Sequence, residues 1–429
     1  MTAAVDVAGD DLVEGDRVEL VVGAPAHGGH CVARLGGEYG RVVFVRHALP
    51  GERVTVEITE LHRGYLRADA VEVHEASPDR VAAPCPYAHP GGCGGCDVQH
   101  VAPRAQRDWK TAVVRDLLAR LGGLSGERID ALDPTVRELP GGPLGWRSRI
   151  RYAVDAADRP GLLKHRSHEV VPIDFCRIAH PRLHELDITA RTWPGVDAVE
   201  AVASTGGDVT VLARRSAAPD ESVLAEADGE TSLIAGSPEV REVAAGREWQ
   251  VPADSFWQIH PAAADTLVTA VLDLLDPQPG EICWDLYGGA GLFAAAVAAR
   301  TGARTTVVES SPVGVAAARR NLADVPGVEV VAAKVDAALA RRRITGPVDL
   351  VVLDPPRSGA GARVVRAVAA AQPRAVVYVA CDPAALARDI KTFAGAGWRV
   401  ESFRAYDCFP MTQHVECVAL LVTDDVTVT

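Results

Sequence analysis

A cysteine and a carboxylate occupy positions that could support covalent chemistry. Cys381 stands in the run Val379-Ala380-Cys381-Asp382-Pro383, about one strand and one helix behind the run Asp354-Pro355-Pro356-Arg357. In a sheet built from alternating strands and helices, the residues that follow successive parallel strands meet at one edge. We therefore expect a thiol and a carboxylate to lie close together and to face a flat substrate.

Glu416 adds a second carboxylate to this set. Carbon 5 of uracil is a poor nucleophile, but a thiolate that adds to carbon 6 creates an enolate able to attack a methyl group on sulfur. A carboxylate can then remove the hydrogen from carbon 5, so that the thiol is released. Taken alone, Cys381 could be a small buried residue and Glu416 a solvated strand residue. Their occurrence with Asp354-Pro355-Pro356 favours the catalytic interpretation.

The residue after the two prolines points to ring-carbon chemistry. Methyltransferases that act on exocyclic amines usually place an aromatic residue there to stack on the target base, whereas this chain has Arg357. Methylation of an amine is therefore less favoured than methylation of a ring carbon, which needs a thiol.

A glycine-rich turn predicts a nucleotide-binding site. The run Asp285-Leu286-Tyr287-Gly288-Gly289-Ala290-Gly291 follows an apolar segment and precedes a helical one, and its glycines permit close approach of a nucleoside. The pattern fits both NAD and S-adenosylmethionine (SAM), and Glu309 could hold the ribose hydroxyls of either. Asp354-Pro355-Pro356 favours SAM, since the chain shows no catalytic pattern of a dehydrogenase.

Three cysteines in one short segment predict a metal site. Cys85, Cys93 and Cys96 are joined by short spacers, and Cys176 is the best candidate for a fourth ligand. Zinc and an iron–sulfur cluster would both accept four thiolates, and a redox pair of Cys93 with Cys96 is a third interpretation. The remaining cysteines are interpreted as structural: Cys31, Cys283, Cys408 and Cys417.

The C-terminal part predicts an α/β domain. From Gly280 onward, apolar strand patterns alternate with helical patterns, which specifies a doubly wound and mostly parallel sheet. The segments 399–403 and 415–422 leave no room for a helix between them, so we expect an antiparallel edge pair. This arrangement is typical of class I SAM-dependent methyltransferases, and we assign residues 251–429 to such a catalytic domain.

Two further parts are expected before the catalytic domain. Five short strand patterns between residues 17 and 74 predict a small OB-fold barrel, assigned to residues 11–76, which could bind RNA or act only as a packing module. Residues 77–250 are assigned to a central, mixed β region with the cysteine segment. Within it, we expect the helix at 104–121 to pack on the catalytic domain.

Composition restricts the class of protein and the way it could bind RNA. The chain has 429 residues and 48% hydrophobic residues, and no run of them is long enough for a membrane span. We therefore expect a cytoplasmic protein without a membrane partner. The net charge of −13 argues against binding nucleic acid through bulk charge. The stretch from Trp146 to His168, rich in arginine and with Tyr152 interleaved, predicts either a local RNA surface with stacking aromatics or a solvated strand.

These motifs together resemble the RNA 5-methyluridine (m5U) methyltransferases, in particular the 23S rRNA uracil-C5 branch that carries an iron–sulfur cluster and a TRAM domain. The resemblance covers nearly the whole chain. Its most specific parts are the cysteine segment 85–96 and the runs 255–260, 354–359, 380–383 and 409–416.

The resemblance implies a role for each candidate residue. Cys381 would be the nucleophile and Glu416 the proton acceptor. A SAM pocket would be lined by Gln258, Tyr287, Glu309, Asp336 and Asp354, and a [4Fe–4S] cluster would be held by Cys85, Cys93, Cys96 and Cys176. This chain departs from the usual motifs at Gly288, Leu292, His260 and Asp382, where Cys, Asn, Asn and Asn are common.

The resemblance implies SAM-dependent methylation of uridine carbon 5 in structured RNA by a monomeric enzyme. The target base would be flipped into the pocket. We expect 23S rRNA as the substrate, with tRNA as the alternative. An RNA-binding or RNA-folding factor of the TRAM type is an alternative of another class, which the presence of both Cys381 and Glu416 disfavours.

Overall fold

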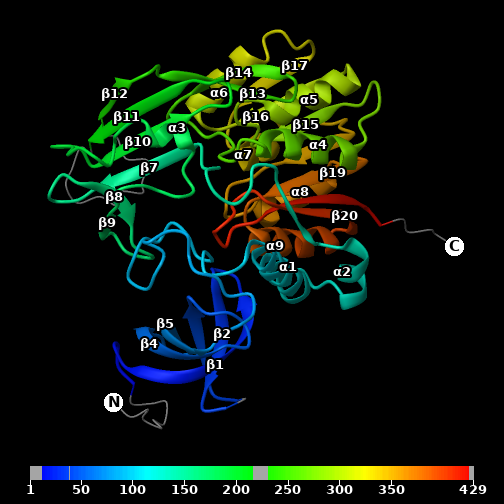
Figure 1. Ribbon diagram of the computed structural model, residues 1–429. Coiled ribbons are helices and arrows are strands. Elements are labelled where there is room, and N and C mark those ends of the chain that lie inside the picture. Colours follow the sequence, from blue (N-terminus) through cyan, green and yellow to red (C-terminus); the bar gives the residue numbers. More distant parts are fainter. Residues whose placement is uncertain (1–11, 38, 216–229, 425–429) are drawn as a thin grey trace.

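The computed structural model describes residues 12–37, 39–215 and 230–424, and shows a barrel, a central sheet and a large α/β unit. Figure 1 shows the barrel at the bottom, the central sheet at the upper left and the α/β unit at the upper right. The cysteine segment 85–96 and the connection between the last two strands lie in the middle, between these three parts. None of the described helices is long and apolar enough to cross a membrane.

The N-terminal barrel is closed by five strands in the order β1-β2-β3-β5-β4. Their bounds are β1 Arg17–Ala26, β2 His30–Leu35, β3 Arg41–Arg46, β4 Arg53–Leu61 and β5 Tyr65–Glu75. Alternate residues point inward, as the period of two requires, and Val43, Val45, Val54 and Leu66 are fully buried. The expected barrel is therefore confirmed.

The central sheet has six strands in the order β12-β11-β10-β7-β8-β9, and a separate hairpin pairs β13 with β14. Their bounds are β7 Arg149–Val154, β8 Pro160–Leu163, β9 Val170–Pro172, β10 Ala198–Ala203, β11 Val209–Arg215, β12 Glu230–Ala235, β13 Glu239–Ala244 and β14 Arg247–Pro252. The short helix α3 (Pro181–His184) packs against β10.

The α/β unit is built on an eight-stranded sheet in the order β17-β16-β15-β18-β19-β21-β20-β6. Its bounds are β6 Val136–Glu138, β15 Cys283–Leu286, β16 Thr305–Glu309, β17 Val328–Ala332, β18 Leu350–Leu353, β19 Ala375–Ala380, β20 Trp398–Asp407 and β21 Glu416–Thr423. The strands β15 to β19 are parallel, and β21 runs antiparallel to both β19 and β20. The expected methyltransferase fold with its antiparallel edge pair is thus confirmed.

Helices cover both faces of this sheet. One face carries α4 (Ala263–Leu275), α5 (Leu292–Thr301) and α6 (Pro312–Asn321), whose apolar residues share one core. The other carries α2 (Gly126–Leu132), α7 (Val335–Ala340), α8 (Gly361–Ala370) and α9 (Pro383–Ala394).

Helix α1 (Pro103–Arg120) joins the barrel to the α/β unit. Its residues Trp109, Val113 and Leu117 enter the barrel core together with two alanines of α9. Val114 and Leu118, on the adjacent side of the helix, enter the core under the large sheet. The spacing of three and four residues places each set on one side of the helix. The helix therefore packs on the catalytic unit and on the barrel at the same time.

One strand departs from the order of the sequence. The strand β6 lies in the span assigned to the central region, yet it pairs in parallel with β20 at the edge of the large sheet. A three-residue strand carries too short a pattern to be recognised, and its pairing depends on the position of α1. Thr111 of α1 holds the start of β6, because its hydroxyl oxygen accepts the Val136 backbone N–H at 3.0 Å.

Candidate active site at the carboxyl edge of the large sheet

The strand register brings the candidate nucleophile and base opposite each other. Ala380 pairs with Cys417 in the antiparallel ladder of β19 and β21. One step further along this ladder, Cys381 faces Glu416. Asp354 follows β18, which is the other neighbour of β19. The three side chains that the sequence singled out therefore come from adjacent strand ends at one edge of the sheet.

The loop after Asp354 is fixed by a buried network. The Tyr378 hydroxyl donates to Asp389 Oδ2 at 2.7 Å, and the Ala360 backbone N–H bonds to both of these oxygens. Gly359 closes a turn with Pro356 and has a φ of 85°, a conformation that a side chain would disfavour. The prolines and Arg357 thus stand on an ordered turn beside Cys381.

Burial and repulsion between like charges raise the pKa values of the carboxyl groups at this edge. Desolvation, together with the neighbouring Asp285, raises the pKa of Asp354 to about 7. Desolvation also raises the pKa of Asp285 to about 7, with a smaller contribution from Glu309. The pKa of Glu416 lies well above its ordinary value, because the group is buried and Asp354 is close. Such a site would be stabilised by a cation.

The thiol of Cys381 is protonated in the free protein. Burial raises its pKa to about 12, and the negative charges of Glu416 and Asp354 add to this effect, while Arg357 opposes it. The next residue, Asp382, begins α9 and accepts the Ala385 backbone N–H at 2.7 Å. A thiol in this state is a poor nucleophile until its proton is removed.

The nucleotide turn contains an unpaired acid that the sequence did not single out. Asp285 Oδ2 accepts the backbone N–H of Ala294 at 2.9 Å. Its Oδ1 atom is buried and has no hydrogen-bond partner within the described part of the chain. The side chain is fully buried. Its position as the first residue of the glycine-rich run was the only signal in the sequence.

Glu309 and Tyr287 frame the same turn. Glu309 ends β16, and its carboxylate accepts the backbone N–H groups of Gly289 at 3.0 Å and of Ser310 and Ser311 at 2.6 Å. Tyr287 follows β15 with a φ of 66°. The bond from Gly289 holds the Glu309 carboxylate next to the glycines. There, the hydroxyl groups of a nucleoside could replace backbone N–H groups as donors to the carboxylate.

Asp336 and Gln258 come from two further elements, and the charge of Asp336 contributes to the raised pKa of Tyr287. Asp336 is in the first turn of α7, at the carboxyl side of β17. Gln258 is half-buried in the connection between β14 and α4, between the buried residues Trp257 and His260. Among the described residues, no hydrogen bond links the Gln258 side chain to Asp354 or Glu416. Both remain predicted pocket residues.

The connection 408–415, which leads to Glu416, is held from several sides. Lys110 of α1 donates to Asp407 Oδ1 at 2.6 Å and to the Phe409 carbonyl at 3.0 Å, and both charged side chains are buried. The Met411 backbone N–H bonds to Gln106 Oε1 at 3.0 Å. None of these contacts was apparent from the sequence, because the partners are far apart in the chain and their residue types are ordinary.

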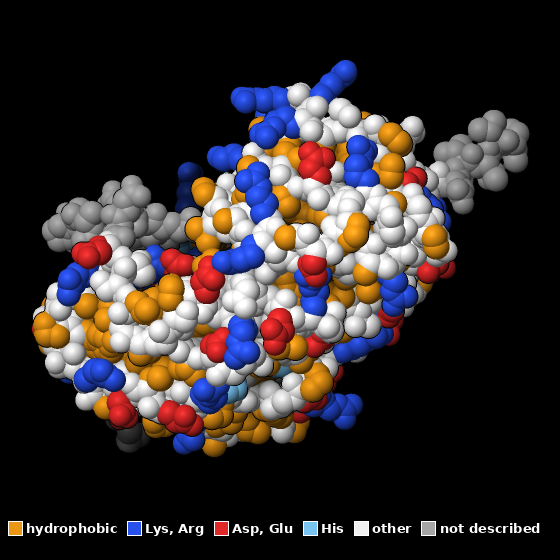
Figure 2. Space-filling view, turned by 90° about the horizontal axis from the view of Figure 1, so that it is seen from above, with side chains coloured by type: hydrophobic (Ala, Val, Ile, Leu, Met, Phe, Trp, Pro, Cys, Tyr) orange, Lys and Arg blue, Asp and Glu red, His pale blue; other side chains and the backbone are white. Residues whose placement is uncertain are grey.

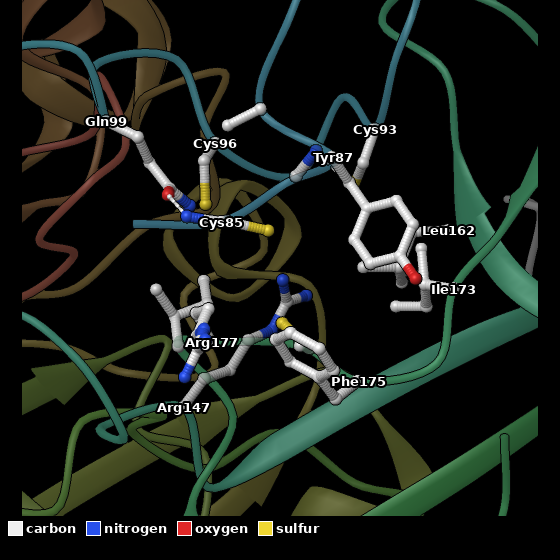
Figure 3. Close-up of a pocket in the computed structure, with 14 residues that line it drawn as sticks. Cys85, Tyr87, Cys93, Cys96, Gln99, Arg147, Leu162, Ile173, Phe175 and Arg177 are labelled. Atoms are coloured by element: carbon white, nitrogen blue, oxygen red, sulfur yellow. Dashed lines mark hydrogen bonds between the residues drawn. The ribbon is translucent and has the colours of Figure 1, made fainter. Parts of the chain in front are cut away.

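The four cysteines predicted to bind a metal line one cavity. Cys85, Cys93, Cys96 and Cys176 surround about 360 Å³ of empty space that is partly open to solvent. Figure 3 shows the sulfur atoms of Cys85 and Cys96 on one side of this space, with Phe175 and Arg177, which flank Cys176, on the other. Within the residues described, no group of three or more His, Cys, Asp or Glu side chains is arranged to hold a metal ion.

Hydrogen-bond donors and a cation surround these thiols. The Gly95 backbone N–H lies 3.3 Å from Cys93 Sγ. Burial raises the pKa of Cys176, while Arg147 and the backbone N–H groups of Ile178 and Ala179 oppose this rise. Cys93 and Cys176 therefore face groups that favour negatively charged sulfur. The cysteines interpreted as structural, Cys31, Cys283, Cys408 and Cys417, are all buried.

The prediction that aromatic side chains between Trp146 and His168 form a stacking surface for RNA is wrong. Trp146 and Tyr152 are only 5% and 2% exposed, and they belong to the core under the central sheet instead of a stacking face. Trp146 stacks on His260, with ring centroids 6.0 Å apart. Arg149 is also engaged, since it bonds to the buried Glu242 at 3.0 Å. The alternation of polar and aromatic residues fits a strand with one buried face as well as it fits an RNA-binding strand.

Charges of both signs cover the face of the molecule seen from above. Figure 2 shows Lys and Arg side chains interspersed with Asp and Glu, apart from one group of basic side chains at its upper edge. This distribution agrees with the acidic net charge of −13. This face therefore offers a nucleic acid local groups of basic side chains and no uniformly basic surface.

Known protein families match the N-terminal and the C-terminal parts of the chain. The TRAM domain family matches residues 12–71, and the family described as tRNA (Uracil-5-)-methyltransferase matches residues 239–424. An uncharacterized RNA methyltransferase of Streptomyces avermitilis is 49% identical, over 95% of this chain and 98% of that protein. The 23S rRNA (uracil(1939)-C(5))-methyltransferase RlmD of Shewanella sediminis is 30% identical, over 92% of this chain and 94% of that protein.

A solved structure shares the fold. The tRNA (uracil-54, C5)-methyltransferase of Pyrococcus abyssi, determined with S-adenosyl-L-homocysteine, aligns with a TM-score of 0.70 over 94% of this chain and 99% of that chain. Its sequence identity is 22%, so it supports the fold alone. The matched families and the nearly full-length relatives lead to one conclusion: the chain belongs to the SAM-dependent RNA uracil-C5 methyltransferases.

Proposed function

We propose that this enzyme methylates carbon 5 of a uridine in 23S rRNA through a covalent bond between Cys381 and carbon 6 of the base. The observation that carries the proposal is the register of β19 and β21, which places Cys381 opposite Glu416 beside Asp354. The choice of rRNA is supported by the relative named as a 23S rRNA methyltransferase, which aligns over nearly the whole chain.

The residues present fit SAM. SAM supplies a methyl group on a cationic sulfur atom. Asp285 has a buried oxygen without a partner in the described chain, and Asp354 is a half-buried carboxylate whose pKa is about 7. A positive charge nearby lowers the pKa of a carboxylate, so both groups favour a cationic ligand. Glu309, Tyr287, Asp336 and Gln258 would complete the pocket.

Each catalytic side chain has a defined task. The thiolate of Cys381 adds to carbon 6, and the resulting enolate takes the methyl group at carbon 5. Glu416 then accepts the proton from carbon 5, the bond between sulfur and carbon 6 breaks, and the thiolate leaves. The raised pKa of Glu416 makes it a stronger base than an ordinary carboxylate once it is ionised.

Two measurements test the activity and the substrate. RNA with 5-fluorouridine at the target should form a denaturation-resistant conjugate with the wild type and none with Cys381→Ala, because fluorine cannot be removed as a proton. SAM binding by the variant should be nearly unchanged. Nucleoside mass spectrometry of rRNA and tRNA from a deletion strain should show loss of m5U from 23S rRNA. Loss of m5U from tRNA alone would change the proposed substrate from rRNA to tRNA. An active Cys381→Ala enzyme would refute the mechanism.

We also propose that Cys85, Cys93, Cys96 and Cys176 hold a [4Fe–4S] cluster. The support is their common cavity and the donors that face the sulfur atoms. In such a cluster each thiolate binds a different iron, so the sulfur atoms surround a volume and do not converge on one point. A single zinc ion would need convergent ligands.

Anaerobic purification distinguishes the cluster from zinc. Wild-type protein should be brown and contain about four irons per chain, the number in a cubane with four thiolate ligands. Cys93→Ser should lose colour and RNA affinity, whereas Cys31→Ser, a change at a buried barrel cysteine, should keep the iron. Colourless protein with one zinc per chain would overturn the cluster without affecting the methyltransferase assignment.

A further inference from the structure

A turn of the barrel reaches the catalytic edge of the large sheet. The turn between β1 and β2 contains His27, whose Nε2 atom lies 3.4 Å from Asp382 Oδ2. Asp382 is the residue directly after Cys381. In the same turn, the Gly28 backbone N–H donates to Gln413 Oε1 at 3.1 Å. Gln413 lies on the connection that leads to Glu416. The turn therefore contacts the segments that carry the nucleophile and the base.

The contact requires the Gly29 backbone to lie close to the Asp97 side chain. Gly29 has a φ of 76°, and a Cβ atom placed on it would lie 2.7 Å from Asp97 Cβ. Asp97 in turn accepts the Gln413 backbone N–H at 3.0 Å. Glycine is needed here both for the positive φ and for the space. A larger residue would push the turn away from the catalytic segments.

Asp382 is fixed through both of its oxygens. Oδ1 accepts the Ala385 backbone N–H and so caps α9, while Oδ2 faces His27. Burial raises the pKa of Asp382, but the bonds from His27 and Ala385 outweigh burial and bring the pKa below its ordinary value. Both side chains are partly exposed, at 34% for His27 and 23% for Asp382. The pair is accordingly a directional contact at the rim of the site and not a core ion pair.

We propose that the β1–β2 turn, residues 27–29, belongs to the catalytic centre, with His27 as a positioning residue for the segment Cys381-Asp382. The proposal rests on the proposed function, in which Cys381 attacks the base. His27 holds Asp382, and Asp382 holds the first turn of α9, so the thiol keeps its direction toward carbon 6. Gly28 supports the opposite wall through Gln413. The barrel thereby contributes to the rate of attack as well as to any contact with RNA.

The first test separates rate from affinity. The rate of conjugate formation with 5-fluorouridine RNA is measured in single turnover at increasing RNA concentration. His27→Ala should lower the rate at saturating RNA by about tenfold, as expected for a misdirected nucleophile, with RNA and SAM affinities within about twofold of wild type. His27→Gln keeps an N–H donor at a similar reach and should recover most of the rate.

A second histidine of the barrel provides the control. His74 lies on β5 and bonds to Thr55 at 2.7 Å, so His74→Ala removes a barrel histidine without touching the turn. This variant should form conjugate at the wild-type rate. A His27→Ala enzyme with wild-type rate at saturation would overturn the proposal. A lower rate that returns to the wild-type value at higher RNA concentration would also overturn it, since that result would assign His27 to RNA binding.

A measurement without RNA keeps this proposal apart from the proposed function. The rate at which iodoacetamide modifies Cys381 is followed by peptide mass spectrometry. His27→Ala and Gly29→Ala should each change this rate by about threefold or more, because a displaced thiol gains a different environment, and His74→Ala should not. Unchanged rates in both turn variants would overturn the positioning role. Failure of the wild type to form any conjugate would refute the proposed function, while the modification rates would still decide the role of the turn.

Discussion

Two buried carboxyl groups, one half-buried carboxyl group and one thiol give the site its chemical character. Asp285, Asp354 and Glu416 all have raised pKa values, and Cys381 is protonated in the free protein. Like charges close together cannot all ionise in a low-dielectric site. The site is therefore arranged so that a cationic ligand brings it into its reactive charge state. This ordering agrees with a reaction in which the methyl donor is itself a cation.

Replacement of Glu416 should separate methyl transfer from product release. Glu416→Gln keeps the size of the side chain but removes its basicity, so attack and methyl transfer should proceed while elimination stalls. A methylated protein–RNA conjugate should then accumulate with ordinary uridine, visible as a gel shift, and turnover should fall by about a hundredfold or more. Glu401→Gln, a change at an exposed residue of β20, should leave turnover unaffected. Inactive Glu416→Gln protein without any conjugate would indicate a structural role.

The raised pKa of Asp285 predicts how stability depends on pH. The pKa of about 7 in the folded protein exceeds the ordinary value of 3.8, so between these values the folded state holds a proton that the unfolded state has lost. Stability should therefore fall as pH rises from about 4 to about 7, by roughly 1 kcal/mol per pH unit for this group. Asp285→Asn keeps an oxygen for the Ala294 N–H and removes the charge. The stability of this variant should therefore fall less steeply as pH rises. Unfolding curves in urea at pH 5 and pH 7 measure the difference, and parallel declines would contradict it.

At the scale of elements, α1 connects the catalytic strands to the rest of the molecule. Lys110 is fully buried and meets Asp407 at the end of β20. Desolvation lowers the pKa of Lys110, and Asp407 opposes this change. A buried pair of this kind is costly to break, because removal of one partner leaves an uncompensated charge. It fixes the point from which the connection to Glu416 departs.

Loss of Lys110 should destabilise the protein strongly. Lys110→Met is expected to lower the free energy of unfolding by about 3–5 kcal/mol, since Asp407 stays buried without its partner. The double change Lys110→Met with Asp407→Leu should recover much of this loss. Arg115→Ala, at a half-exposed ion pair on the same helix, should cost less than about 1 kcal/mol. Denaturant unfolding of the four proteins measures these differences, and equal losses for Lys110→Met and Arg115→Ala would contradict the role of the buried pair.

The elements differ in how far the sequence predicts them. The barrel strands and the alternating strands from β15 to β19 carry strong local patterns, and the predicted strands lie close to the observed ones. The strand β6 was missed, because its three residues pair with β20 only once α1 is in place. Trp146 and Tyr152 were placed on a surface, because a strand with one buried face and an RNA-binding strand share the same alternation. Cys381 and Glu416 were predicted from their chemistry and stay predictions, whereas His27, Lys110 and Asp97 act only through partners that are remote in sequence.

At the scale of the whole molecule, three parts meet at Asp97. The Asp97 and Val98 backbone N–H groups donate to the Met411 carbonyl at 3.0 and 3.1 Å, and the Asp97 carboxylate accepts from Gln413. Arg46 of the barrel lies 3.4 Å from the same carboxylate. Asp97 also directly follows Cys96. The barrel, the cysteine segment and the connection to Glu416 are thus joined at one residue. In Figure 1 the cysteine segment and this connection both lie in the middle of the molecule.

Removal of the Asp97 carboxylate should therefore affect stability and catalysis together. Asp97→Ala leaves the Arg46 guanidinium and the Gln413 N–H without their acceptor, at an expected cost of about 2–4 kcal/mol in unfolding free energy. The connection to Glu416 should loosen, so elimination should slow while SAM affinity stays near the wild-type value, because the nucleotide turn lies on other strands. Asp79→Ala, at an exposed acid that also precedes α1, should change neither property. Calorimetry for SAM and single-turnover kinetics measure the two effects. A stability loss without any kinetic defect would confine Asp97 to folding, and a loss of SAM affinity would contradict the separation of the two segments.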